Sequence, residues 1–196
     1  GGNNYYLKAK KLNKMKTFDD LVSCFDKLIE EKYTSKGNIV ISSGSAGGMS
    51  NGFLMNNHPE YFKGVCTSVG FLTIILTMVN SKLPLTKIEE EQWGAPLTSK
   101  EAFEYIMRFD PYFGVRKQRY PMLYFSNSLT DPRVGFYESL KFIQKLRENK
   151  KDNNPIIMRC DLAASHGGAS SRWDALKKDV IPEQAWILKL FNKHKS

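Results

Sequence analysis

The sequence has few of the residues that build metal centres and disulfide frameworks. Its 196 residues include three cysteines and three histidines, and no pair of cysteines has the spacing of zinc ligands. The cysteines are far apart and lie in apolar runs, which predicts buried free thiols in a reducing compartment, and we expect a cytoplasmic protein: Cys24, Cys66 and Cys160. No cofactor and no metal ion are expected.

Long apolar runs are missing as well. The most apolar stretch, residues 71–79, is closed by Asn80 and Lys82 and is too short to span a membrane. The net charge is +9, from 29 Lys and Arg against 20 Asp and Glu. The basic residues do not alternate with aromatic ones in a pattern typical of nucleic-acid binding. We therefore expect no membrane and no nucleic-acid partner. The lysines are interpreted as solvated surface, with a basic partner-binding face as the alternative.

Short apolar strands alternate with amphipathic helices along the chain. The patterns predict strands at 39–41, 65–69, 121–126 and 155–160, and helices at 17–32, 49–55, within 70–80, at 102–109, 137–148 and 175–192. The basic stretch up to Lys16 is expected to be a loop, and residues 81–100 a surface excursion. This alternation predicts one α/β domain whose sheet is mostly parallel and flanked by helices.

One stretch, residues 38–48, organises the rest. An apolar strand runs into Ser43-Gly44-Ser45-Ala46-Gly47-Gly48 and then into a helix. A serine on such an elbow projects its hydroxyl out of the sheet, and the helix dipole faces the same point. Taken alone, the pattern is equally typical of a glycine-rich turn that cradles phosphate.

Two further residues stand where the third and fourth predicted strands end. Asp131 follows one strand and His166 follows the other, so the chain order is Ser45, Asp131, His166, which is the triad order of α/β-hydrolases. The carboxyl ends of parallel strands meet at one edge of a sheet. His166 would be the general base, Asp131 would orient it, and the N–H of Ala46 would stabilise an oxyanion. Singly, Asp131 could be a turn residue before Pro132, and His166 a loop histidine.

Six segments together resemble the prolyl oligopeptidase family of serine peptidases, and its oligopeptidase B branch most closely. The resemblance runs over nearly the whole chain and lies in Gly1-Gly2, in Lys16-Thr17-Phe18-Asp19-Asp20, in Ser45-Ala46-Gly47-Gly48, in residues 84–94, in Asp131-Pro132-Arg133-Val134 and in His166-Gly167-Gly168-Ala169-Ser170. It implies that residues 1–196 are the C-terminal part of an α/β-hydrolase catalytic domain. It also implies hydrolysis of short peptides after Arg or Lys through an acyl-enzyme.

The resemblance also assigns substrate contacts. Glu89 and Glu91 match the acidic residues that receive the Arg or Lys side chain, and a pair of carboxylates can bind a guanidinium by charge-assisted hydrogen bonds. Arg133 is implied to contact the substrate backbone or a carboxylate. From the residues alone, 89–91 would be a solvated acidic run and Arg133 a surface arginine. The functional alternatives are an esterase or prolyl-specific peptidase of the same fold, and a non-catalytic scaffold.

Some parts depart from the family pattern or lie outside this chain. Ser43 and Ser165 stand where the family usually has glycine. The family's β-propeller, and a tyrosine that supplies a second oxyanion donor, would precede residue 1. In the family's strand order the elbow strand is central. We therefore predict an open strand edge in this chain, covered by the missing N-terminal part or by another chain in a homo-oligomer.

Overall fold

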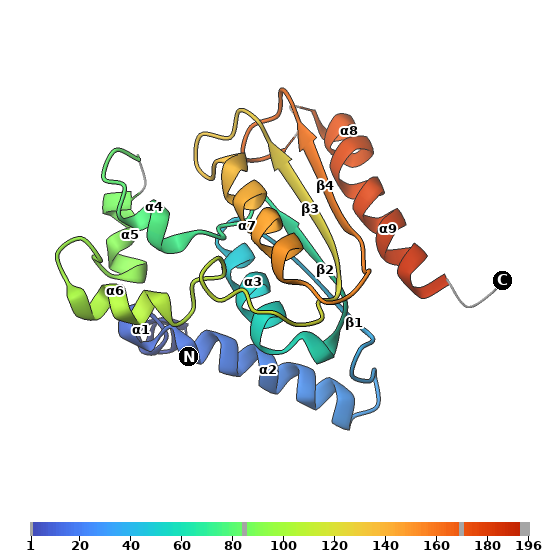
Figure 1. The fold of residues 1–196 in the computed structure, drawn as a ribbon, viewed down its shortest axis with the longest axis horizontal. Helices are drawn as coiled ribbons and strands as arrows, with labels where there is room; N and C mark the ends of the chain where they lie inside the picture. Colours follow the sequence, from blue (N-terminus) through green and yellow to red (C-terminus); the bar gives the residue numbers. More distant parts are fainter. Residues whose placement is uncertain (1, 84–85, 169–170, 193–196) are drawn as a thin grey trace.

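A parallel four-stranded sheet forms the centre of the fold. The computed structural model describes residues 2–83, 86–168 and 171–192. The sheet order follows the chain order, and every neighbouring pair is parallel: β1 (Ile39–Gly44), β2 (Phe62–Ser68), β3 (Met122–Ser128) and β4 (Ile156–Asp161). The four predicted strands and the α/β class are confirmed. Since all strands run the same way, their carboxyl ends share one edge of the sheet (Figure 1).

Helices cover both faces of this sheet. One face carries α3 (Gly47–Asn57) and α7 (Phe136–Asn149), with α2 (Met15–Glu30) packed on α3. Its core is aromatic, and the rings of Phe18 and Phe53 stack with centroids 4.0 Å apart. The other face carries the C-terminal helices, which are α8 (Arg172–Ala175), the π-helical segment η3 (Leu176–Val180) and α9 (Ile181–Asn192). Trp186 of α9 packs on Tyr124 of β3.

The remaining helices form a separate group beside the carboxyl edge of the sheet. On the left of Figure 1 are α1 (Gly2–Lys8), α4 (Ile74–Met78), α5 (Thr86–Trp93) and α6 (Lys100–Met107). The 3-10 turns are η1 (Lys11–Asn13), which contacts α5 and α6, and η2 (Pro59–Tyr61), which leads into β2.

The structure corrects two expectations about this group. The basic stretch before Lys16 is largely helical, with α1 followed by the 3-10 turn η1, and Lys10 and Lys11 pair with Glu91 of α5, a contact that local periodicity cannot reveal. Residues 81–100 are also more than a surface excursion, since α5 buries Trp93 against Phe71. Residues 84 and 85, part of the family-like segment, lie outside the described residues, as do Ala169 and Ser170.

The expectation of three buried thiols is wrong for one of them. All three cysteines are free; Cys66 is buried and Cys160 half-buried, but Cys24 is exposed. Cys24 lies on α2 next to Phe25, whose side chain faces the core. Neighbouring helix positions point about 100° apart, so burial of Phe25 turns Cys24 toward solvent.

The elbow strand lies at the edge of the described sheet. Among the described residues β1 pairs with β2 alone, which agrees with the predicted open edge. No helix in the described ranges has both the length and the apolar character that a membrane crossing would require.

Candidate active site

Ser45 lies at the tip of the turn between β1 and α3. Its φ is +52°, a left-handed conformation that costs energy for a residue with a side chain. Two backbone hydrogen bonds hold it there, since the Ser45 N–H donates to the Ser68 carbonyl and the Phe71 N–H donates to the Ser45 carbonyl, both at 2.9 Å. A Cβ on Gly48 would lie 2.5 Å from the Cα of Gly70, so the crossing of the two chain segments requires glycine there.

Three side chains from three strand ends meet at this turn. The Nε2 atom of His166 lies 3.0 Å from the Ser45 hydroxyl, and its Nδ1 atom lies 2.7 Å from Oδ2 of Asp131. The Asp131 side chain is fully buried. Its other oxygen accepts hydrogen bonds from the N–H groups of Arg133 and Val134, at 2.8 and 3.0 Å. Asp131 is therefore a turn residue and the orienting partner of His166 at once.

The two serines that replace family glycines are accommodated. Ser43 lies within the extended strand β1, so its backbone needs no glycine, although its buried hydroxyl has no hydrogen-bond partner among the described residues. A Cβ added to Gly47 would lie 2.9 Å from the Cβ of Ser43. The glycine at position 47 therefore leaves the space that the Ser43 side chain needs. Ser165 is exposed, and its carbonyl accepts a hydrogen bond from the Gly168 N–H at 3.0 Å, which closes the turn after His166.

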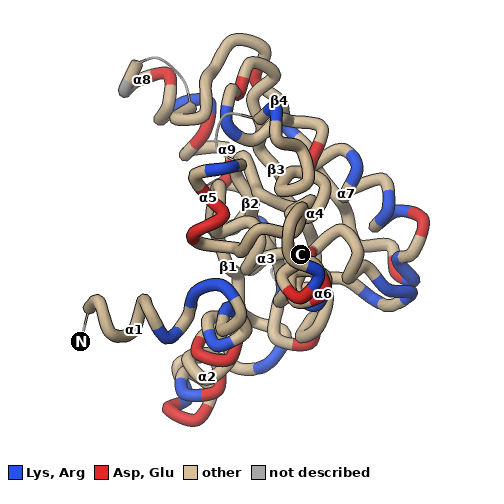
Figure 2. The backbone as a smooth tube through the Cα atoms, turned by 90° about the vertical axis from the view of Figure 1, so that its left-hand side faces the viewer, with Lys and Arg blue, Asp and Glu red and all other residues tan. Residues whose placement is uncertain are grey.

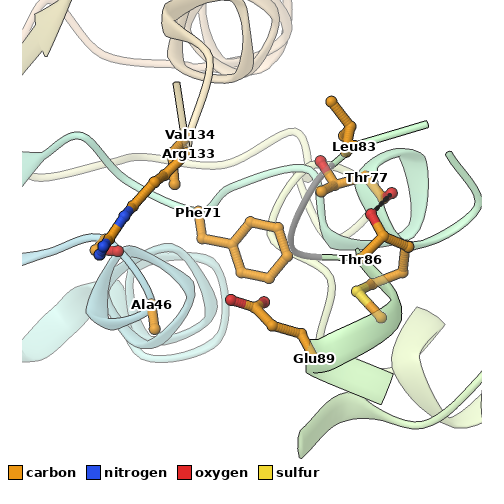
Figure 3. Close-up of a pocket in the computed structure, with 10 residues that line it drawn as sticks. Ala46, Phe71, Thr77, Leu83, Thr86, Glu89, Arg133 and Val134 are labelled. Atoms are coloured by element: carbon orange, nitrogen blue, oxygen red, sulfur yellow. Dashed lines mark hydrogen bonds between the residues drawn. The ribbon is translucent and has the colours of Figure 1, made fainter. Parts of the chain in front are cut away.

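A cavity opens beside Ser45 (Figure 3). It is lined by Ser45, Ala46, Phe71, Thr77, Met78, Leu83, Thr86, Glu89, Arg133 and Val134. The carboxylate of Glu89 points toward the space beside the Phe71 ring, and Arg133 lies on the opposite side above Ala46. Ala46 caps the amino end of α3, so the positive end of the helix dipole faces this space.

Glu89 is fixed by a residue that the sequence reasoning did not assign to the site. The Trp93 indole N–H donates a hydrogen bond of 2.8 Å to Oε2 of Glu89. The indole is buried and its ring centroid lies 5.8 Å from that of Phe71. The Lys14 Nζ atom lies over the indole ring, 5.1 Å from its centroid, and burial lowers the pKa of this lysine. The spacing of Glu89 and Trp93, one helical turn, was the available signal.

The structure does not bring Glu91 to this cavity. Glu91 forms ion pairs with Lys10 and Lys11, the latter at 2.8 Å, and these pairs lower its pKa to about 2. Figure 2 shows the acidic part of α5 next to the basic stretch that joins α1 to α2. Residues two apart on a helix point in nearly opposite directions, so Glu89 lines the cavity while Glu91 points away from it.

Within the described ranges, no three His, Cys, Asp or Glu side chains gather as a metal ion would need. The site is built from hydrogen-bonding and acid–base groups. Its arrangement supports removal of a proton from a hydroxyl by an oriented imidazole.

A parallel sheet with a strained serine elbow, and with His and Asp on later strand ends, defines the α/β-hydrolase fold. The prolyl oligopeptidase family matches residues 1–194, and the chain belongs to that family. The solved oligopeptidase B of Trypanosoma brucei, in its closed form with covalently bound antipain, is 36% identical with a TM-score of 0.91 over 96% of this chain. The enzyme from Leishmania major is 34% identical, with a TM-score of 0.90 over 94% of this chain.

Among curated proteins, Protease 2 of Moraxella lacunata is 36% identical over 187 residues, which is 95% of this chain. The chain nevertheless spans only about a quarter of each relative. The shares are 27% of the Moraxella protein, 26% of the Trypanosoma chain and 25% of the Leishmania chain.

Proposed function

We propose that this chain carries the acyl-transfer centre of a serine peptidase that cleaves short peptides after Arg or Lys. The observation that carries the proposal is the hydrogen-bonded line from Ser45 through His166 to the buried Asp131, with an acid-bearing cavity next to the serine. The family membership and the similarity to oligopeptidase B structures support it.

The chemistry follows from the roles that these groups can take. His166 Nε2 accepts the Ser45 proton while Ser45 Oγ bonds to the scissile carbonyl carbon, and the carbonyl oxygen becomes an oxyanion that the Ala46 N–H stabilises. The C–N bond then breaks as His166 returns the proton to the leaving amine. Water, deprotonated by His166, releases the acid from the acyl-enzyme and restores Ser45. Asp131 stays ionised and stabilises the imidazolium.

The preference for a basic side chain is proposed to come from Glu89. A guanidinium or ammonium in the cavity would donate hydrogen bonds to the Glu89 carboxylate, its charge partner, and the Phe71 ring offers a face for cation–π contact. Arg133, exposed on the opposite side, is proposed to bind the substrate backbone or a carboxylate. Glu91 would contribute a second carboxylate only after its ion pairs with Lys10 and Lys11 break, so we assign the preference to Glu89.

The open edge of β1 is proposed to be covered by the upstream part of a longer protein. The observation that supports this is that β1 has one neighbouring strand among the described residues. We expect the longer protein to be a monomer in which the backbone amides of β1 exchange hydrogen slowly. A dimer of this chain that protects β1 equally would assign the edge to a second copy.

Four peptide amides that differ only in the residue before the scissile bond test the preference. They carry Arg, Lys, citrulline or norleucine. Citrulline keeps the shape of Arg without its charge. We expect cleavage of the Arg and Lys substrates, and Glu89→Gln should raise KM for Arg by about ten- to a hundredfold because a charged hydrogen-bonded partner is lost. The matched control is Glu91→Gln, the same change on the same helix, which should leave KM within about threefold.

The opposite ranking of the two variants, or equal cleavage of the Arg and norleucine substrates, would contradict the assignment of Glu89. Cleavage only of simple esters would favour the esterase alternative.

A further inference from the structure

Two fully buried carboxylates stand behind the cavity wall and take no part in the chemistry above. Glu138 lies in the first turn of α7, and Asp110 follows α6; each residue is 1% exposed. Within the described part of the chain, no Lys or Arg forms an ion pair with either. Burial raises the pKa of both, that of Asp110 to about 6. Groups this costly to bury call for a structural reason.

That reason is the segment of residues 72–77, which runs from just after Phe71 into α4. Glu138 Oε2 accepts hydrogen bonds from the N–H groups of Leu72 and Thr73, at 2.9 and 3.0 Å, and its Oε1 accepts one from the Thr77 hydroxyl at 2.8 Å. Asp110 Oδ2 accepts a hydrogen bond from the Ile75 N–H at 2.8 Å. An ionised carboxylate has only acceptors, so it matches the N–H and hydroxyl donors that this segment turns toward Glu138 and Asp110.

The same segment adjoins the cavity. Thr77 lines the cavity, and so do Phe71 and Met78, the residues that flank the segment. α4 is five residues long, too short to be stable without external partners. The Thr77 carbonyl also accepts a hydrogen bond from the Thr86 hydroxyl, at 3.1 Å, at the start of the helix that carries Glu89. The position of the pocket acid is thus connected to Glu138 through two successive hydrogen bonds.

We propose that Glu138 and Asp110 are positioning residues that hold segment 72–77 in place and so set the shape of the substrate side-chain pocket. The inference rests on the proposed peptidase function, and it assigns these residues to substrate binding, not to proton transfer at Ser45. Loss of either should therefore weaken binding of substrates that fill the pocket and spare those that do not.

The test compares Glu138→Ala, Glu138→Gln and the control Glu148→Gln, an exposed position of the same helix, in the protein with its natural flanking sequence. One substrate is the peptide amide that the unmodified protein prefers, whatever its side chain. The other is p-nitrophenyl acetate, whose acyl group is too small to reach the pocket wall. Hydrogen exchange is followed in peptides that cover 71–78 and, for comparison, β3.

With Glu138→Ala we expect KM for the peptide amide to rise more than tenfold, while acetate hydrolysis stays within about twofold. Exchange protection should be lost at 71–78 and kept in β3. Glu138→Gln should restore most of the affinity and protection, because its carbonyl oxygen can still accept from Leu72 and Thr73. Asp110→Asn, which replaces one acceptor oxygen by a donor, should give an intermediate rise in KM. This variant tests the proposal if Glu138→Ala does not fold.

Parallel loss of both activities, or loss of protection throughout the protein, would reduce Glu138 to a general stability role and overturn the proposal. Unchanged protection at 71–78 in Glu138→Ala would do the same. A preference for a non-basic peptide would overturn the proposed specificity but leave this comparison valid, because the exchange measurement does not depend on activity.

Discussion

Trp93 donates its indole N–H to Glu89 at 2.8 Å, from one turn further along the same helix. This hydrogen bond connects the buried aromatic side chains beside the pocket to the carboxylate of Glu89. The indole packs on Phe71, which also lines the cavity. An aromatic residue of the core thereby determines where the carboxylate points.

Trp93→Phe should weaken the binding of basic substrates while the ring packing is kept. The phenyl ring retains most of the contact with Phe71 but cannot donate to Glu89. A hydrogen bond to a charged group contributes about 1.5–3 kcal/mol, so we expect KM for the Arg amide to rise about tenfold at nearly unchanged kcat. Trp173→Phe is the matched control, since Trp173 is 70% exposed. Equal effects of the two variants would show that Glu89 does not depend on this bond.

Asp131→Asn should impair catalysis without displacing the turn. The amide oxygen can still accept from the N–H groups of Arg133 and Val134, whereas the amide N–H₂ would face His166 and favour the wrong tautomer. In another serine-protease fold the equivalent change lowers kcat by about 10⁴, and we expect a loss of similar order here, measured at saturating substrate.

The control for that variant is Asp161→Asn. Asp161 closes a matching turn after β4, where its Oδ1 accepts from the N–H groups of Ala163 and Ala164 at 2.9 and 3.0 Å. This variant should keep kcat within about tenfold of the unmodified protein. Similar losses in both variants would indicate that the turns matter and the contact with His166 does not.

Gly48→Ala should destabilise the elbow. The added methyl group would lie 2.5 Å from the Cα of Gly70 and 2.9 Å from the Phe71 nitrogen, and both are backbone atoms that cannot move independently. Overpacking of this kind costs about 1–3 kcal/mol of unfolding free energy. At Gly167 an added Cβ meets nothing within 4 Å, so Gly167→Ala should leave the thermal unfolding temperature nearly unchanged. A larger effect at Gly167 than at Gly48 would contradict the packing described for the elbow.

Asp110 should make stability depend on pH in a defined direction. Burial raises its pKa from 3.8 to about 6 in the folded state, so the folded protein holds this proton more tightly than the unfolded chain. Its contribution to stability is fully present below pH 3.8 and is lost as pH rises through about 6. The change amounts to about 3 kcal/mol.

The measurement for Asp110 is the unfolding free energy of Asp110→Asn relative to the unmodified protein at several pH values. The difference between them should shift in favour of the variant from pH 4 to pH 7. A constant difference would show that Asp110 titrates normally.

The sheet could be predicted from the sequence because each strand is a short apolar run bounded by turn residues. Because the carboxyl ends of parallel strands meet at one edge of a sheet, Ser45, Asp131 and His166 were expected to lie together. The structure brings them within hydrogen-bond distance. The helices of the lysine-rich start could not be predicted, since they have no apolar period of their own, and the pairing of Lys10 and Lys11 with Glu91 is a long-range contact.

The pocket was less accessible to sequence reasoning than the triad. Glu89 and Glu91 were paired as substrate ligands without the helix that carries them being expected, and on that helix the two side chains point in different directions. Glu138 resembled an ordinary acidic residue in a first helical turn. It shares a face with Phe142 and Leu146, four and eight residues later, and that spacing was the signal of its burial.

The most direct test of the central claim uses peptidyl diphenyl phosphonates, which bond covalently to an activated serine. One carries a guanidinium side chain next to phosphorus and the other norleucine, and the modified residue is located by mass spectrometry. We expect a single adduct on Ser45, faster with the guanidinium compound and slowed by Glu89→Gln, and no adduct in Ser45→Ala or His166→Ala. An adduct on another residue, or peptide cleavage that persists in Ser45→Ala, would contradict the account.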